Sequence, residues 1–148
     1  MISSFEYAYD SAGNIVKEIQ NQSGEIYTRT YTYDSADEVT GFSEAKDSGV
    51  TTYSYSYDKA GNRLSADISG SDGNKHTAYS YNAGDELTSQ NQDGNRISYN
   101  YDPNGNLIKA TTQGNQATYY DYDSEDRLLR IFQGVSGLLT SWNQNKNR

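Results

Sequence analysis

Cysteine is absent from this 148-residue chain, which also has a single histidine and a single proline. Without cysteine the chain can form neither a disulfide nor a thiolate metal site. One histidine, His76, provides no second imidazole for a zinc site and no familiar nucleophile–base pair. The chain has no run of about 18 apolar residues, so the sequence predicts no transmembrane helix. These absences exclude thiol chemistry and disfavour several classes of metalloprotein.

Aliphatic residues are also scarce. Ile, Leu, Val and Phe make up about 15% of the chain, which is below the roughly 20% under which highly charged chains stay disordered. The formal net charge of −8 is small for this length, and the 15 tyrosines supply contact area that the aliphatic count misses. We therefore predict a folded chain with a thin core. The acidity argues against nucleic acid as a partner, because neutralising phosphate needs clustered Lys and Arg.

A tyrosine pattern recurs along the chain. Two tyrosines stand two residues apart, an Asp or Asn follows the second, and Gly-Asn or Asp with a charged residue comes shortly afterwards. The pairs are Tyr7 and Tyr9, Tyr31 and Tyr33, Tyr55 and Tyr57, Tyr79 and Tyr81, Tyr99 and Tyr101, and Tyr120 and Tyr122. The second tyrosines are 24, 24, 24, 20 and 21 residues apart. A period near 24 with a fixed internal order indicates a repeat protein.

Each repeat reads as two strands and two turns. In the first repeat, Phe5–Tyr9 alternates large apolar residues with small or polar ones, as a half-buried strand does. Residues 10–14 form a turn, Ile15–Ile19 a returning strand, and Asn21–Gly24 a second turn. No segment has a sustained helical apolar stripe. The predicted fold is all-β: one antiparallel sheet of about twelve strands from consecutive hairpins, curved or spiralling.

The repeats define the expected domain organisation. We predict six repeats within residues 1–133, at about residues 5–26, 27–50, 51–74, 75–94, 95–114 and 115–133. Residues 134–148 are expected to form a partial strand and a polar tail, with a turn over Gly134–Gly137 and a strand over Leu138–Trp142. The first 20 residues hold no apolar signal core, and we expect the sequence to be a segment of a longer protein.

The recurring Asp and Gly positions are interpreted as turn residues. An Asp side chain can accept a hydrogen bond from the backbone two residues on, and Gly or Asp tolerates positive φ. The turn residues are Asp10, Gly13, Asp34, Asp37, Asp58, Gly61, Asn82, Asp85, Asp102, Gly105, Asp123 and Asp126. The second turns carry Gly24, Gly49, Gly73, Gly94 and Gly114.

The same recurrence argues against a catalytic role for these carboxylates. Six copies in equivalent turns do not provide the special environment that tunes one catalytic group. The loop over residues 102–106 resembles a calcium loop, but the closing bidentate Glu is absent. The sequence therefore predicts no catalytic residue, no cofactor and no metal site.

The tyrosine pairs admit two interpretations. As a core, they form a structural ladder across neighbouring strands on one face with Ile15, Val39, Leu64, Leu87, Leu107 and Leu128, and Ser, Thr, Asn and Gln occupy the other face. As an exposed surface, rows of tyrosine would suit sugar rings. We favour the core, because so few aliphatic residues could otherwise hold the sheet together.

An enzyme such as a glycosidase or lyase would need two carboxylates in an environment unlike that of the other repeats, and the sequence marks no such pair.

The segments Tyr55–Leu64 and Tyr99–Leu107 carry the pattern Tyr-x-Tyr-Asp-x-x-Gly-Asn followed by an aliphatic residue. Repeated over about residues 5–133, this pattern resembles the Rhs/YD-repeat family. Relatives include bacterial polymorphic toxins, the cocoon-forming components of insecticidal toxin complexes and the teneurins. The resemblance implies a β-sheet that spirals into a hollow shell, enclosing a C-terminal effector in the toxins. The self-cleaving core segment of the toxins has no counterpart here, and six repeats are too few to enclose a protein.

The predicted function is thus a non-enzymatic structural module, a segment of the β-sheet shell of a bacterial YD-repeat protein that encapsulates or presents a toxin effector. Its expected partners are adjacent repeats or further copies of itself, because the outer strands expose backbone groups. A toxin effector and glycans are further candidate partners, whereas nucleic acid is not. We expect a secreted or cell-surface location. The alternative is a carbohydrate-binding module of a surface adhesin, which uses exposed tyrosine rows.

Overall fold

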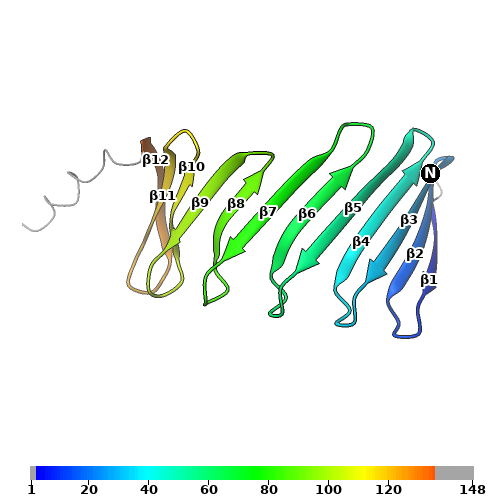
Figure 1. Ribbon diagram of the computed structural model, residues 1–148, viewed down its shortest axis with the longest axis horizontal. Coiled ribbons are helices and arrows are strands. Elements are labelled where there is room, and N and C mark those ends of the chain that lie inside the picture. Colours follow the sequence, from blue (N-terminus) through cyan, green and yellow to red (C-terminus); the bar gives the residue numbers. More distant parts are fainter. Residues whose placement is uncertain (1–2, 136–148) are drawn as a thin grey trace, which may run out of the picture. The chain divides into compact units, whose positions relative to one another are not determined.

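The computed structural model describes residues 3–135, and within this range every regular element is a β-strand (Figure 1). The strands are β1 (Ser3–Tyr9), β2 (Ile15–Gln22), β3 (Glu25–Tyr33), β4 (Val39–Lys46), β5 (Gly49–Tyr57), β6 (Arg63–Ser69), β7 (Lys75–Tyr81), β8 (Leu87–Gln92), β9 (Asn95–Tyr101), β10 (Leu107–Thr112), β11 (Gln116–Tyr122) and β12 (Leu128–Val135). The prediction of an all-β fold of twelve strands is confirmed.

The strands form one antiparallel sheet in which their order follows the sequence from β1 to β12. Each repeat contributes one hairpin, such as β1 with β2, and each hairpin pairs sideways with the next, as β2 does with β3. The chain divides into two compact units between Ala78 and Tyr79, and each unit is described separately below. The predicted curvature of the sheet stays a prediction.

Every hairpin whose register is described to its end has a β-bulge next to the first turn. In β5 and β6, Ser56 pairs with Ser65, but the next pair is Tyr57 with Arg63, so Leu64 is an extra residue. The same shift occurs in the hairpins β1–β2, β3–β4, β9–β10 and β11–β12. A bulge increases the local twist and redirects the strand that carries it. The second tyrosine of each of these repeats thereby lies opposite the first residue of the returning strand.

The two faces of the sheet differ in burial. In β5, Tyr53, Tyr55 and Tyr57 are half-buried, whereas Thr52, Ser54 and Ser56 are exposed. Among residues 3–135 only Ala117 and Ser89 are buried, at 3% and 6% exposure, and no large side chain is fully enclosed. The core is therefore thin, as expected from the composition, and the large side chains of the tyrosine face are half-buried and not enclosed.

Two details of the sequence interpretation are wrong. Leu64 was assigned to the tyrosine face, but the bulge pairs Arg63 with Tyr57 and leaves Leu64 40% exposed. A turn was expected to begin at Gly134, but Gly134 lies in β12 and pairs with Ala117. β12 therefore continues two residues beyond the predicted end of the repeats at residue 133. The strand predicted over Leu138–Trp142 lies outside the described residues.

The second turns also differ in detail from the expectation. Ser23 and Gly24 both have positive φ, as do Asp93 and Gly94, which is the type I′ geometry that suits a two-residue hairpin. In the turn after β10 the residue with positive φ is Asn115, not Gly114. Asn is among the few residues other than glycine that tolerate this conformation. Of the described residues, none belongs to a helix that could cross a bilayer.

Candidate structural site: tyrosine seams and hairpin turns

The second tyrosine of a repeat is linked by its hydroxyl to the preceding repeat. The hydroxyls of Tyr33, Tyr57, Tyr101 and Tyr122 donate to the backbone carbonyls of Ile15, Val39, Leu87 and Leu107, at 2.8, 2.9, 3.0 and 3.2 Å respectively. Each acceptor is the first residue of the previous returning strand. We call each such junction between consecutive hairpins a tyrosine seam.

Each seam gives a hydrogen-bond acceptor to a tyrosine hydroxyl that is partly shielded from water. Tyr57 and Tyr101 are half-buried, and this burial raises the pKa values of both groups above the ordinary value of 10.0. A tyrosine hydroxyl in such a place usually finds a hydrogen-bond partner. Because the acceptor is a backbone carbonyl, the seam does not depend on the side chain of the preceding repeat.

The other tyrosines of the predicted ladder are also half-buried, except at the edge of the sheet. Tyr31, Tyr55, Tyr79, Tyr81, Tyr99 and Tyr120 are half-buried. Tyr7 and Tyr9 of the outer strand β1 are 47% and 57% exposed. In the first unit a continuous aromatic row crosses three strands, because the Phe42 ring lies 5.1 Å from both the Tyr31 and the Tyr53 rings, measured between centroids. The sequence analysis did not assign Phe42 or Tyr53 to this face.

An ionic row lies beside these rings in the first unit. Arg29 of β3 donates to Glu18 of β2 at 3.0 Å and to Glu44 of β4 at 2.9 Å, and the three side chains are only 14–24% exposed. Gln20 and the Tyr31 hydroxyl complete the network. The hydrogen bond with Glu44 is the largest cause that raises the pKa of Arg29. This row links three strands and was missed by the sequence analysis.

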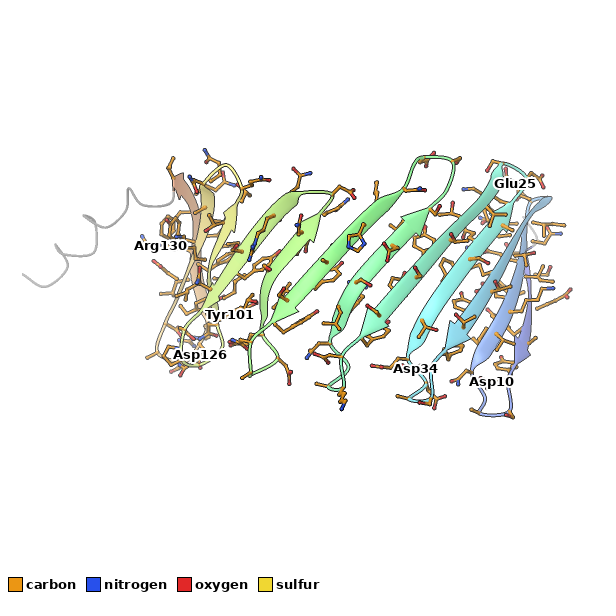
Figure 2. All side chains as sticks on the ribbon, in the orientation of Figure 1. Asp10, Glu25, Asp34, Tyr101, Asp126 and Arg130 are labelled. Atoms are coloured by element: carbon orange, nitrogen blue, oxygen red, sulfur yellow. The ribbon has the colours of Figure 1, made fainter. Side chains whose placement is uncertain are left out.

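The Asp or Asn after each second tyrosine accepts two backbone hydrogen bonds. Oδ1 of Asp10 accepts from the N–H groups of Ala12 and Asn14, both at 2.9 Å. The same pair of bonds is made by Asp34, Asp58, Asn82, Asp102 and Asp123. Figure 2 shows Asp10 and Asp34 at the same end of their hairpins, opposite the end that carries Glu25.

The residue three positions after this acceptor has positive φ in every first turn. Gly13, Gly61 and Gly105 have φ of 94°, 86° and 86°, and Asp37, Asp85 and Asp126 have φ near 60°. The two turn types that alternate along the sequence therefore adopt the same left-handed conformation. Asp is tolerated at this position because its short polar side chain can bond locally.

Neighbouring first turns are connected to one another. Within the first unit, the Asn14 amide donates to Asp37 at 2.7 Å, and in the second unit Asn106 donates to Asp126 at 2.7 Å. In the other direction, Glu38 Oε1 lies 3.0 Å from the position that a Cβ would take on Gly61. Odd turns thus donate to even turns, and the acidic residue of an even turn covers the glycine of the next odd turn.

The turn carboxylates predict how stability depends on pH. Backbone N–H groups, chiefly that of the residue four positions later, lower the pKa values of Asp10, Asp34, Asp58 and Asp123 from 3.8, and the Asn106 amide does so most for Asp102. A lowered pKa in the folded state stabilises the protein above pH 3.8, and this stabilisation is lost as the pH falls further. Glu38 acts oppositely, because burial raises its pKa above 4.5.

We therefore expect the free energy of unfolding to fall below about pH 4, since five groups lose stabilisation and one gains it. Urea unfolding at pH 6 and pH 3 measures the difference. A variant with all five Asp→Asn changes keeps the acceptor, as Asn82 does, and should show a shallower dependence on pH. Equal slopes for the two proteins would show that the turn carboxylates do not control the acid response.

On the face opposite the tyrosines, hydroxyl side chains bond to one another across neighbouring strands. Thr30 and Ser43 share a hydrogen bond across the strands at 2.6 Å, and Ser56 and Ser65 share one at 2.7 Å. His76 faces Asp67, with Nδ1 and Oδ1 2.6 Å apart and both side chains about half exposed. Across residues 3–135 no cluster of His, Cys, Asp or Glu could hold a metal ion.

In the second unit this opposite face carries an aromatic pair. Tyr119 of β11 stacks on Phe132 of β12 with ring centroids 5.2 Å apart. Lys109 and Arg130 lie over the two rings, and Arg130 pairs with Asp121. Tyr119 directly precedes the ladder residue Tyr120, so strand alternation turns it to the other face. Sequence spacing could have indicated this orientation, because Tyr119 stands outside the two-residue pairs.

One family model and several solved structures match this chain. Residues 67–136 match the model of the family described as Teneurin YD-shell. The structure titled "Crystal Structure of TcdB2-TccC3-Cdc42" has a TM-score of 0.71 and 21% identity, covering 86% of this chain and 7% of that chain. "Crystal Structure of TcdB2-TccC3" has a TM-score of 0.68 and 15% identity, covering 86% and 8%. None of the curated proteins matches in sequence. The chain spans less than a tenth of the two solved chains.

Taken with the tyrosine seams, these matches define the chain as an all-β repeat protein built from hairpins of one kind. The family match over residues 67–136, together with the shared fold, confirms the resemblance to the YD-repeat family noted in the sequence. The family match and the shared fold support a structural module of a YD-shell.

Proposed function

We propose that this chain is a non-enzymatic segment of a β-sheet shell that encapsulates or presents a toxin effector, and that its outer strands pair with further YD repeats or with copies of itself. The carrying observation is the tyrosine seam, which repeats with the same donor position and the same backbone acceptor in both units. A seam that needs no particular neighbouring side chain lets one repeat follow another without limit.

The geometry of the turns supports a structural role for their carboxylates. Each one is occupied by two backbone N–H groups of its own turn, and the equivalent position in the fourth repeat is the neutral Asn82. A general acid or nucleophile needs an environment that differs from that of its neighbours, and the turns repeat theirs. This repetition is the support for proposing that the module has no catalytic activity.

Carbohydrate binding is not favoured as a second function. The hydroxyls of four second tyrosines are already engaged with backbone carbonyls, and their rings are half-buried. We propose a secreted or cell-surface location, which is supported by the match of residues 67–136 to the Teneurin YD-shell family. Adjacent repeats and an enclosed effector are the proposed partners.

A chimera tests the shell function. Residues 3–135 would replace an equal number of repeats in a family member whose shell encloses an effector, and the enclosed effector would be challenged with protease. We expect the effector to stay protected, because the seams supply the same backbone connections. The matched control carries Tyr→Phe at residues 33, 57, 101 and 122, and should be less protected. A chimera that melts cooperatively yet exposes its effector would contradict the proposal.

A further inference from the structure

The two outer strands of the described sheet, β1 and β12, both expose large apolar side chains. β1 exposes Phe5 at 50% and Tyr9 at 57%, and β12 exposes Leu128 at 49% and Ile131 at 56%. Nothing within residues 3–135 pairs with β1 on the side away from β2, or with β12 on the side away from β11. Strand edges of this kind accept an additional strand through their backbone groups.

The seams follow one register in both units. The residue two positions after the start of a returning strand always pairs with the residue three positions before the second tyrosine of the next repeat. The pairs are Lys17 with Thr30, Gly41 with Ser54, Ser65 with Ala78, Ser89 with Ser98, and Lys109 with Tyr119. The residue types differ from one of these pairs to the next. The register is therefore set by the position in the repeat and not by the individual side chains.

We propose that β12 of one molecule pairs with β1 of a second copy of this chain in the seam register, with Arg130 opposite Glu6 of that copy. The inference rests on the self-association in the proposed function and specifies its partner strand and register. By the same register Ile131 lies opposite Phe5, and the Tyr9 hydroxyl reaches the carbonyl of Leu128, as Tyr122 reaches that of Leu107.

The charges at this junction are complementary. Arg130 already pairs with Asp121 on its own strand pair, and Glu6 would approach it from the other side. The result is a carboxylate–guanidinium–carboxylate row across three strands, the arrangement that Glu18, Arg29 and Glu44 make in the first unit. Opposite charges that face each other across an antiparallel pair stabilise the pairing.

The turns at this junction also match. The chain holds six repeats of alternating type, so an even turn of one molecule would precede an odd turn of the next, as inside each unit. Arg127 occupies the position of Glu38, whose pKa is raised chiefly by burial and by the contact with Asp34, and least by the like charge of Asp58. At the junction Arg127 would instead meet Asp10 of the second copy. An attraction therefore replaces the repulsion found between the second and third turns.

Cysteine cross-linking tests the register, because the chain has no cysteine of its own. Glu6→Cys and Arg130→Cys variants are made separately and oxidised alone and as an equal mixture at high protein concentration. We expect a disulfide-linked dimer in the mixture only. Ala8→Cys with Arg130→Cys is the matched control, since Ala8 lies two residues along the same face as Glu6, and it should give little product.

The possible results of these experiments distinguish the β12–β1 register from the proposed shell function. A dimer from Glu6→Cys alone would mean that the β1 strands pair symmetrically, and would overturn the inference. Mass that rises with concentration in sedimentation equilibrium without the mixed dimer would overturn the register but keep self-association. A monomer at every concentration would overturn both, and would leave the protease test of the shell unaffected.

Charge reversal provides a second readout that involves no cysteine. Arg130→Glu and Glu6→Arg should each weaken association about tenfold, because each puts like charges opposite one another. In the mixture, β12 of either variant meets a charge of opposite sign on β1 of the other variant, so both mixed junctions are attractive and dimer formation should recover. Equal association of both variants and the unmodified chain would contradict the proposed contact. Circular dichroism checks that each variant keeps its β-structure.

Discussion

Replacing Tyr57 with alanine is expected to lower the free energy of unfolding by about 2–3 kcal/mol, which is less than the cost at a fully enclosed aromatic site because Tyr57 is half-buried. Tyr57→Phe keeps the ring and removes only the hydrogen bond to the Val39 carbonyl, so it should cost about 1 kcal/mol. Urea unfolding of both variants, followed by circular dichroism at low protein concentration, separates the two contributions.

The control for Tyr57→Phe is Tyr9→Phe. Tyr9 holds the same position in its repeat but lies in the outer strand β1 and is 57% exposed. In dilute solution its hydroxyl has no seam to form, so the change should cost less than about 0.5 kcal/mol. Equal effects at the two positions would mean that the seam hydrogen bond does not stabilise the sheet.

Arg29→Met should also destabilise the chain by about 2–3 kcal/mol. The change leaves Glu18 and Glu44 close together and partly buried without the guanidinium between them. Breaking a buried ion pair costs about 3–5 kcal/mol, and the 14–24% exposure of these side chains lowers the expected value. Chemical unfolding at neutral pH measures the loss.

A triple variant provides the comparison for Arg29→Met. Glu18→Gln, Arg29→Met and Glu44→Gln together remove all three charges, so most of the lost stability should return. If Arg29→Met alone were as stable as the unmodified chain, the row would be an ordinary surface ion pair with little energetic weight. Such a result would leave the aromatic rings as the main stabilising contacts of this face.

The periodic features of the fold were predictable from the sequence. The spacing of the tyrosines predicts the strands, and the Asp and Gly positions predict the turns, because both depend on local chemistry that recurs in every repeat. The error at Leu64 has a physical reason: the bulge beside the first turn inserts one residue, so counting by two from the next strand selects the wrong neighbour of Tyr57. Gly134 was read as a turn, although its pairing with Ala117 keeps it in a strand.

The contacts between repeats were not predictable in the same way. Arg29 is 11 residues from Glu18 and 15 from Glu44, and none of the three belongs to the repeated pattern. They meet because the seam between β2 and β3 places Arg29 opposite Glu18, and the register of the β3–β4 hairpin places it opposite Glu44. The tyrosine hydroxyl bonds were hidden for a related reason, since their acceptors are backbone carbonyls that no side-chain motif can mark.

Backbone hydrogen exchange at the seams tests the central claim most directly. If the hairpins join edge to edge, the amides that pair β2 with β3, β4 with β5, and β10 with β11 should be protected as strongly as those within each hairpin. Protection confined to the interior of hairpins, with fast exchange at the seams, would mean that the repeats are independent hairpins, and would contradict a continuous shell segment.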